Sequence, residues 1–191
     1  MIFKVNHFEE VHHRVAIAGT ISDRVTQRPI ANAVVQIETM MVGGKPLQTL
    51  TRADGFFVFL DLAVGQYPLN VSAPSAGSRY GFTTVAIAVS AQEPNRKITV
   101  DAKANVQLSP THLTGIVQRS DTNQAIANAL VQVMGNHTQT LTDQDGRYLL
   151  SGMQAGNPTI QVSANRFVTV KQQVVLTKGQ VTNQNFLLTS N

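Results

Sequence analysis

The 191-residue sequence contains no cysteine and no tryptophan, and only 14% of its residues are charged. Without cysteine the chain can form no disulfide bond and offers no thiolate to a metal ion. The charged fraction lies well below the roughly 25% of typical domains. Threonine, glutamine, asparagine and serine fill the polar positions instead, which is typical of the exposed faces of β-sheets. No apolar run approaches the about 18 residues that a membrane-spanning helix needs.

The N-terminus lacks the features of an export signal. Residues 1–10 contain no apolar core of the required length, and Glu9 and Glu10 stand where that core would continue. We therefore expect no signal peptide in the given sequence, and a location in the cytoplasm or on a cytoplasmically assembled particle. A signal peptide that had been removed would leave the same appearance.

The net charge of +4 and the isoelectric point near 9.7 suggest nucleic-acid binding, but the basic residues are scattered. Residues 1–109 carry ten basic against eight acidic side chains, and residues 110–191 carry five against three. Binding to phosphates requires a stripe of basic side chains. The only cluster is Arg96 and Lys97 with Lys103 nearby, so the sequence predicts no nucleic-acid partner.

Three sequence blocks occur twice in the same order, which identifies an internal duplication. The blocks are VAIAGTI and THLTGIV at 15–21 and 111–117, IANAVVQ and IANALVQ at 30–36 and 126–132, and TLTRADG and TLTDQDG at 49–55 and 140–146. Each copy is long enough to bury about two-thirds of its unfolded surface. We predict an N-terminal arm or extra edge strand at residues 1–13, a first domain at 14–109 and a second domain at 110–191.

Each copy contains about seven short segments of alternating polarity, with turn signals every 8–12 residues or so, which predicts a β-sandwich. The strongest turn signals are the Asp-Gly pairs, which predict tight hairpins in which glycine supplies a positive φ. Asp54, Gly55, Asp145 and Gly146 are therefore predicted to be structural turn residues.

The repeated residues resemble the carboxypeptidase regulatory-like domain, a transthyretin-like or prealbumin-like sandwich. In the first copy the resemblance rests on Gly19, PIANAVV at 29–35, Thr51, DGFF at 54–57 and AVGQY at 63–67. In the second copy it rests on Gly115, IANA at 126–129, DGRY at 145–148 and AG at 155–156, with Ala125 replacing the proline. It implies an all-β protein of two tandem seven-stranded antiparallel Greek-key β-sandwiches. Such domains serve as accessory modules on peptidases, surface proteins and transporters.

Catalytic motifs are missing from the sequence. An intradiol-type iron site would need two tyrosines and two histidines together, whereas Tyr67 and Tyr148 fall on predicted core faces. The sequence has no G-x-S-x-G elbow, no H-E-x-x-H pair and no phosphate-binding glycine loop. We therefore predict that the protein is not an enzyme and binds no cofactor.

Two groups of residues suggest a metal site at first sight. The segment DQDG at 143–146 resembles part of a calcium loop, but residues 110–191 contain no glutamate and Arg52 stands at the position of Asp143. His7, His12 and His13 have no carboxylates to fix them as ligands. We predict no metal site.

The segment 56–60 predicts a contact surface. Alternation places Phe57 and Phe59 in the core and leaves Phe56, Val58 and Leu60 on the outer face. Three large apolar residues in one row are expected to be covered. The candidates are another chain and the apolar arm, which carries Ile2, Phe3, Val5 and Phe8.

We therefore interpret the protein as a non-catalytic structural or interaction protein: a rigid tandem β-sandwich adaptor, spacer or surface component of a larger assembly. Its partners are expected to be other protein subunits, and one version is an accessory component of a phage-tail-like or contractile injection particle. The alternative is an accessory module that binds glycans or peptides. Glycan binding is disfavoured because tryptophan is absent and most Phe and Tyr positions fit the core.

Overall fold

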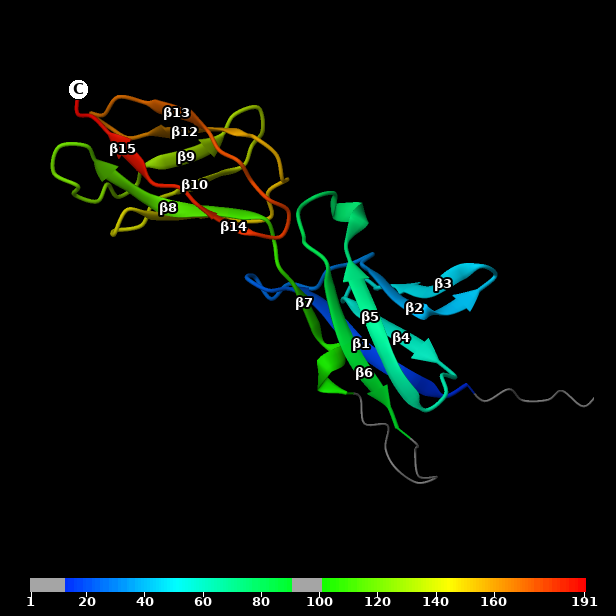
Figure 1. Cartoon of the computed structure of the whole chain (residues 1–191). Coiled ribbons are helices and arrows are strands. Elements are labelled where there is room, and N and C mark those ends of the chain that lie inside the picture. Colours follow the sequence, from blue (N-terminus) through cyan, green and yellow to red (C-terminus); the bar gives the residue numbers. More distant parts are fainter. Residues whose placement is uncertain (1–12, 91–100) are drawn as a thin grey trace, which may run out of the picture.

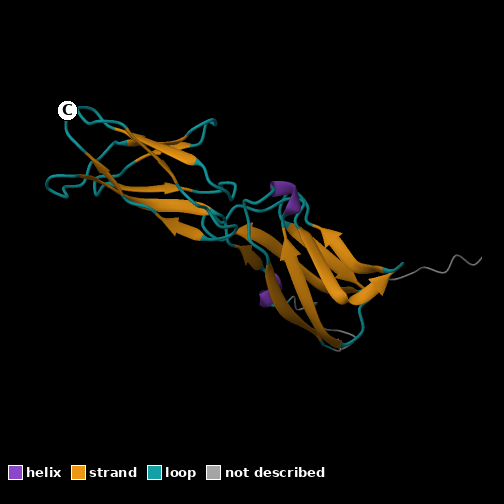
Figure 2. Ribbon diagram, turned by 45° about the horizontal axis from the view of Figure 1, so that its top comes forward, coloured by secondary structure: helices purple, strands orange, loops and turns teal. Residues whose placement is uncertain are grey.

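The computed structural model describes residues 13–90 and 101–191, which form two β-sandwiches joined end to end (Figures 1 and 2). The first sandwich contains β1 (Val15–Asp23), β2 (Val34–Val42), β3 (Lys45–Leu50), β4 (Phe56–Leu60), β5 (Gly65–Ser72), β6 (Thr83–Val89) and β7 (Val106–Leu108). Two short 3₁₀ helices, η1 (Pro74–Ala76) and η2 (Ala102–Ala104), lie between strands. The strand orders are β4-β1-β7 in one sheet and β3-β2-β5-β6 in the other.

The second sandwich repeats this plan. It contains β8 (His112–Arg119), β9 (Leu130–Val133), β10 (Gln139–Leu141), β11 (Arg147–Leu150), β12 (Thr159–Ser163), β13 (Val170–Gln173), β14 (Val181–Asn183) and β15 (Phe186–Leu188). Its sheets are β10-β9-β12-β13 and β11-β8-β14, and β15 pairs further along β8. Because β14 and β15 pair with the same strand, they form one interrupted last strand. The predicted fold of two tandem β-sandwiches is confirmed.

Two details of the predicted strand arrangement are wrong. The last strand of each copy pairs with the first strand in parallel, whereas the other pairs are antiparallel. The sequence also predicts one closing strand from Ile98 to Leu108 for the first copy, whereas the structure has a strand only at Val106–Leu108, preceded by η2. Residues 98–100 lie outside the described residues. Asn105 interrupts the pairing: its side-chain oxygen accepts hydrogen bonds from the backbone N–H and the hydroxyl of Thr20.

The predicted hairpins at the Asp-Gly pairs are also wrong, although the chain does turn there. β3 and β4 lie in opposite sheets, as do β10 and β11, so each turn crosses the sandwich. β4 pairs with β1 instead, with Phe56 opposite Thr20. An Asp-Gly pair reports a tight turn with a positive φ, but the strand that follows it pairs with whichever neighbour completes a sheet.

The residues of the repeated blocks make the same structural contacts in both copies. In the first copy the buried Thr51 hydroxyl donates a hydrogen bond to the Ile30 carbonyl (2.6 Å) and accepts one from the Ala33 N–H (2.8 Å). Thr142 makes the same two bonds, at 2.7 and 2.8 Å, in the second copy. Asn32 and Asn128 both have φ of 55°, which asparagine tolerates better than most residues. The matched residues therefore explain the shared fold of the two copies.

The two domains meet through a set of hydrogen bonds around the linker. The Ser78 N–H and hydroxyl both lie 2.8 Å from the Gln154 side-chain oxygen, and the Ala155 N–H donates to the Ser78 hydroxyl. Thr111 joins both sides, because its hydroxyl donates to the Ser78 carbonyl and accepts from the Gly179 N–H. The first domain thus rests on the turn at residues 153–155 of the second.

Candidate protein-contact surface

The row formed by Phe56, Val58 and Leu60, here called the β4 row, lies on the outer face of the β4-β1-β7 sheet. Phe57 and Phe59 point into the core of the first domain. Phe56 and Val58 are half-buried, and Leu60 is 42% exposed. The row is therefore apolar and accessible in part.

Phe56 is partly covered by its own turn. The Arg52 guanidinium lies 5.4 Å from the centre of the Phe56 ring, a cation–π contact worth about 0.5–1 kcal/mol at an exposed site. The aligned residue of the second domain is Arg147, whose guanidinium instead pairs with Asp145. At the same position of the sheet, the first domain thus carries an apolar aromatic side chain and the second a charged one.

A cavity of about 520 Å³ lies where β1 begins, β4 turns into β5 and β6 ends. These segments lie at the end of the first domain that faces away from the second (Figure 1). The walls of the cavity include Val15 and Ala16 at the start of β1, Leu62 and Val64 in the β4–β5 turn, and Val89 at the end of β6. Val15 is also the β-ladder partner of Leu60. The β4 row therefore ends beside this cavity, and together we call them the distal surface.

Asp61 fixes the edge of the distal surface. It has a φ of 57°, and its carboxylate accepts a hydrogen bond from the Arg14 N–H (2.8 Å) and lies 2.5 Å from His13 Nδ1. The Arg14 N–H bond and His13 lower the pKa of Asp61. The aligned residue in the second domain is Gly152, with φ of 67°. A charged residue has therefore replaced the residue that adopts this conformation without strain.

Comparison of the two copies shows that the part of the second domain that matches the distal surface is an interface. The turn at 62–64 aligns with the turn at 153–155, and in the second domain that turn is the docking site for the first domain. In the first domain the same turn lines the open cavity, and Val64 is 67% exposed where Ala155 bonds to Ser78. A surface that is occupied in one copy is thus open in the other.

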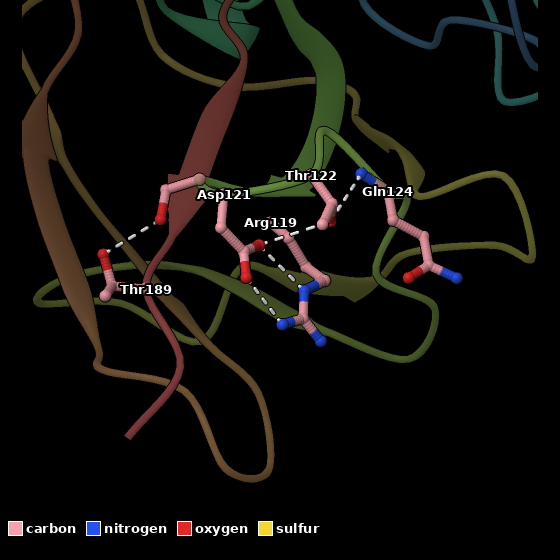
Figure 3. A network of polar contacts seen from close by, with 6 residues as sticks. Arg119, Asp121, Thr122, Gln124 and Thr189 are labelled. Atoms are coloured by element: carbon pink, nitrogen blue, oxygen red, sulfur yellow. Dashed lines mark hydrogen bonds and ion pairs between the residues drawn. The ribbon is translucent and has the colours of Figure 1, made fainter.

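At the opposite end of the molecule, Figure 3 shows a network of polar contacts around the loop at 119–124. The Arg119 Nε and Nη2 atoms donate to the two carboxylate oxygens of Asp121 at 3.0 and 2.8 Å. The Ser120 and Thr189 hydroxyls lie 3.2 Å apart and tie the loop to the C-terminal strand. An end whose polar groups bond to each other leaves less to gain from a partner.

The remaining sequence-predicted residues are placed as follows. Ile2, Phe3, Val5 and Phe8 lie outside the described residues. Gly55 and Gly146 have φ of 76° and 71°. Asp54 accepts a hydrogen bond from the Phe56 N–H at 3.0 Å, whereas the Asp145 carboxylate pairs with Arg147.

Within residues 13–90 and 101–191, no group of three or more His, Asp or Glu side chains is placed to hold a metal ion. No helix in the same residues is long and apolar enough to cross a membrane. Sequence reasoning missed the turn at 62–64, because only the structure shows that its counterpart in the other copy is an interface. The signal available in the sequence was Val64 in place of Ala155.

The sequence profile of the carboxypeptidase regulatory-like domain matches residues 16–109 and again residues 112–189. The chain belongs to this family. Each carboxypeptidase regulatory-like domain corresponds to one sandwich, and the resemblance seen in the sequence is confirmed. No curated protein sequence matches the chain.

The solved structures that match the chain are distant. A type II cohesin–X-dockerin complex from Acetivibrio cellulolyticus matches with 17% identity and a TM-score of 0.36, over 41% of this chain and 56% of that one. This chain thus spans less than two-thirds of that structure. A double mutant of the shaft pilin SpaA from Lactobacillus rhamnosus GG matches over 94% of this chain and 97% of its own, with 10% identity and a TM-score of 0.42. The TIE protein of Bacillus anthracis matches with 12% identity and a TM-score of 0.39, over 93% of this chain and 34% of that protein's chain.

Proposed function

We propose that the protein is a non-catalytic adaptor or spacer of a larger protein assembly, and that the first carboxypeptidase regulatory-like domain carries its main contact surface. The observation that carries this proposal is the open turn at 62–64, whose counterpart at 153–155 is a domain interface. The adjacent β4 row adds apolar area, and burial of such area contributes about 25 cal/mol per Å².

The N-terminal arm takes part in this contact. The described chain begins at His13, beside Asp61 and the cavity. Ile2, Phe3, Val5 and Phe8 precede His13 in the sequence, and we propose that they cover this surface until a partner displaces them. The proposed units are residues 14–109 and 110–191, with other protein subunits as partners.

The finer form of the proposal is an accessory component of a phage-tail-like or contractile injection particle that is made in the cytoplasm. It is supported by the combination of two sandwich domains with an apolar contact end. An accessory module for glycans or peptides is the rival class of function.

The test uses two variants of the distal surface. Phe56→Ser with Val58→Thr removes the apolar row, and Val64→Ser alters the turn alone. We expect both to reduce co-sedimentation of the protein with its particle, and to make the N-terminal arm more sensitive to protease. Val64→Ser matters because its side chain is largely exposed, so loss of assembly cannot be ascribed to misfolding.

The matched control is Arg147→Ser with Leu149→Thr, which alters the same positions of the second domain and should leave assembly intact. If the two distal variants sediment with the particle like the native protein and keep a protected N-terminus, the contact lies elsewhere. If the native protein binds immobilised glycans or peptides and the two distal variants lose that binding, with no protein partner found, the rival class is favoured.

A further inference from the structure

Phe82 is the most exposed of the large apolar side chains in the described residues, at 80%. It lies directly before β6, on the outer side of the β3-β2-β5-β6 sheet, and takes no part in the distal surface. The sequence suggested that most aromatic residues fit the core, which disfavoured a sugar site. Phe82 removes that objection, because it offers a bare aromatic face.

Phe82 lines a groove of about 580 Å³ across β2, β5 and β6, a size within the roughly 300–1,000 Å³ of ligand sites. Its other walls are mainly polar and include Gln36, Glu38, Asn70 and Thr84. Gln36, Asn70 and Thr84 stand in one cross-strand row, which spans about 10 Å over three strands. The groove is thus a row of hydrogen-bonding groups with an aromatic ring at one side.

The polar row is held in a defined geometry. The Thr84 hydroxyl donates to the Asn70 side-chain oxygen at 2.7 Å, so the Asn70 NH₂ group is the donor that it offers to a ligand. Gln36 supplies both a donor and an acceptor, and Glu38 supplies an acceptor. Such a set matches a ligand rich in hydroxyl groups, each of which donates and accepts.

The charge of the groove narrows the class of ligand. Glu38 is its only charged wall, and none of the residues that line it is basic. An acidic glycan or a nucleic acid would meet a carboxylate without a balancing cation. We propose that this groove binds an extended, neutral polysaccharide, with Phe82 stacked on one sugar ring and the side chains of Gln36, Asn70 and Glu38 bonded to hydroxyl groups.

The second domain provides an internal comparison. Its sheet carries the matching row Gln132, Gln161 and Lys171, so the polar positions are kept while a cation replaces Thr84. Thr169 precedes β13 where Phe82 precedes β6, as the pairing of Val170 with Val162 and of Thr83 with Val71 shows. The proposal therefore assigns the polysaccharide to the first domain alone, on a face separate from the distal surface.

The test is isothermal titration calorimetry of the full chain with cellohexaose, mannohexaose and xylohexaose. We expect at least one of these neutral sugars to bind, and Phe82→Ala to weaken that binding at least tenfold, which corresponds to about 1.4 kcal/mol. Phe82→Trp should keep or strengthen it, because a larger aromatic face stacks on the same ring. Thr169→Ala, the matched change in the second domain, should leave it unchanged.

Phe82 is so exposed that its replacement leaves the core intact, which circular dichroism of each variant verifies. The proposal is overturned if none of the three sugars binds at millimolar concentration, or if Phe82→Ala binds like the native protein. It is equally overturned if only an acidic glycan such as a heparin hexasaccharide binds. Failure here would leave the proposed assembly function untouched, since that function uses the other sheet.

Discussion

The two carboxypeptidase regulatory-like domains share a scaffold and differ on their surfaces. Thr51 and Thr142 make the same pair of buried hydrogen bonds, and Asn32 and Asn128 adopt the same φ. In contrast, Phe56 of the first domain stands where the second has Arg147. The duplicated residues hold the fold, and the residues that have diverged since duplication are the candidates for function.

The divergence is concentrated in the first domain. Its turn at 62–64 is open while the matching turn is an interface, and Phe82 replaces a threonine at the edge of a polar groove. The second domain uses its equivalent end to hold its neighbour. The second domain therefore buries this end against its neighbour, whereas the first domain leaves the matching end exposed.

The largest effect is expected from separating the two domains, which tests whether each folds on its own. We expect a fragment of residues 110–191 to give a cooperative thermal transition and a β-type circular dichroism spectrum. Its core, from Leu113 to Leu188, is built from its own strands, and it loses only the contacts at the junction. A disordered spectrum for this fragment would show that the second sandwich depends on the first.

A smaller effect is expected at the cross-sheet turns. Gly55→Val and Gly146→Val should each destabilise their own domain by roughly 1–3 kcal/mol, because both positions have a positive φ. A Cβ atom at either position would also collide with a backbone carbonyl, that of Ile21 or Val117. Hydrogen exchange resolved by NMR measures each domain separately.

Gly44→Val is the control for these turns. Gly44 has a φ of 77°, but a Cβ atom there would meet nothing within 4 Å. Its substitution should therefore cost less than the other two. Equal losses at all three glycines would mean that the close approach of the backbone is unimportant, and no loss at Gly55 or Gly146 would contradict the turn assignment.

The smallest expected effect concerns Asp61, which has no charged counterpart in the second domain. Because its pKa is lowered in the folded state from an ordinary value of 3.8, its carboxylate adds stability above that pH and loses it as the pH falls through the folded-state pKa. The measurement compares denaturant unfolding of the native protein with that of Asp61→Gly. This substitution introduces the residue type that the second domain has at the aligned position, Gly152. The stability difference between them should shrink from pH 7 to pH 3, and a constant difference would argue against the His13 and Arg14 contacts.

The sequence predicted those features that recur locally. Repeated blocks such as IANA are enough to predict two sandwiches, and alternation along 56–60 is enough to place Phe57 and Phe59 in the core. Strand pairing after Asp54-Gly55 could not be predicted, since a turn signal is local and the choice of sheet depends on β1. The open turn at 62–64 and the exposure of Phe82 depend on which surfaces the domains bury against each other, and no periodicity reports that.

The close contact between Gly81 of the first domain and Gly179 of the second fixes how the two domains are placed relative to each other. The two backbones approach so closely that any side chain at Gly179 would displace Gly81. Together with the Thr111 hydroxyl, which is bonded on both sides, this leaves the domains little freedom to pivot. The distance and the angle between the two domains are therefore fixed. A partner bound to the first domain would therefore be held at a fixed distance from a partner bound to the second.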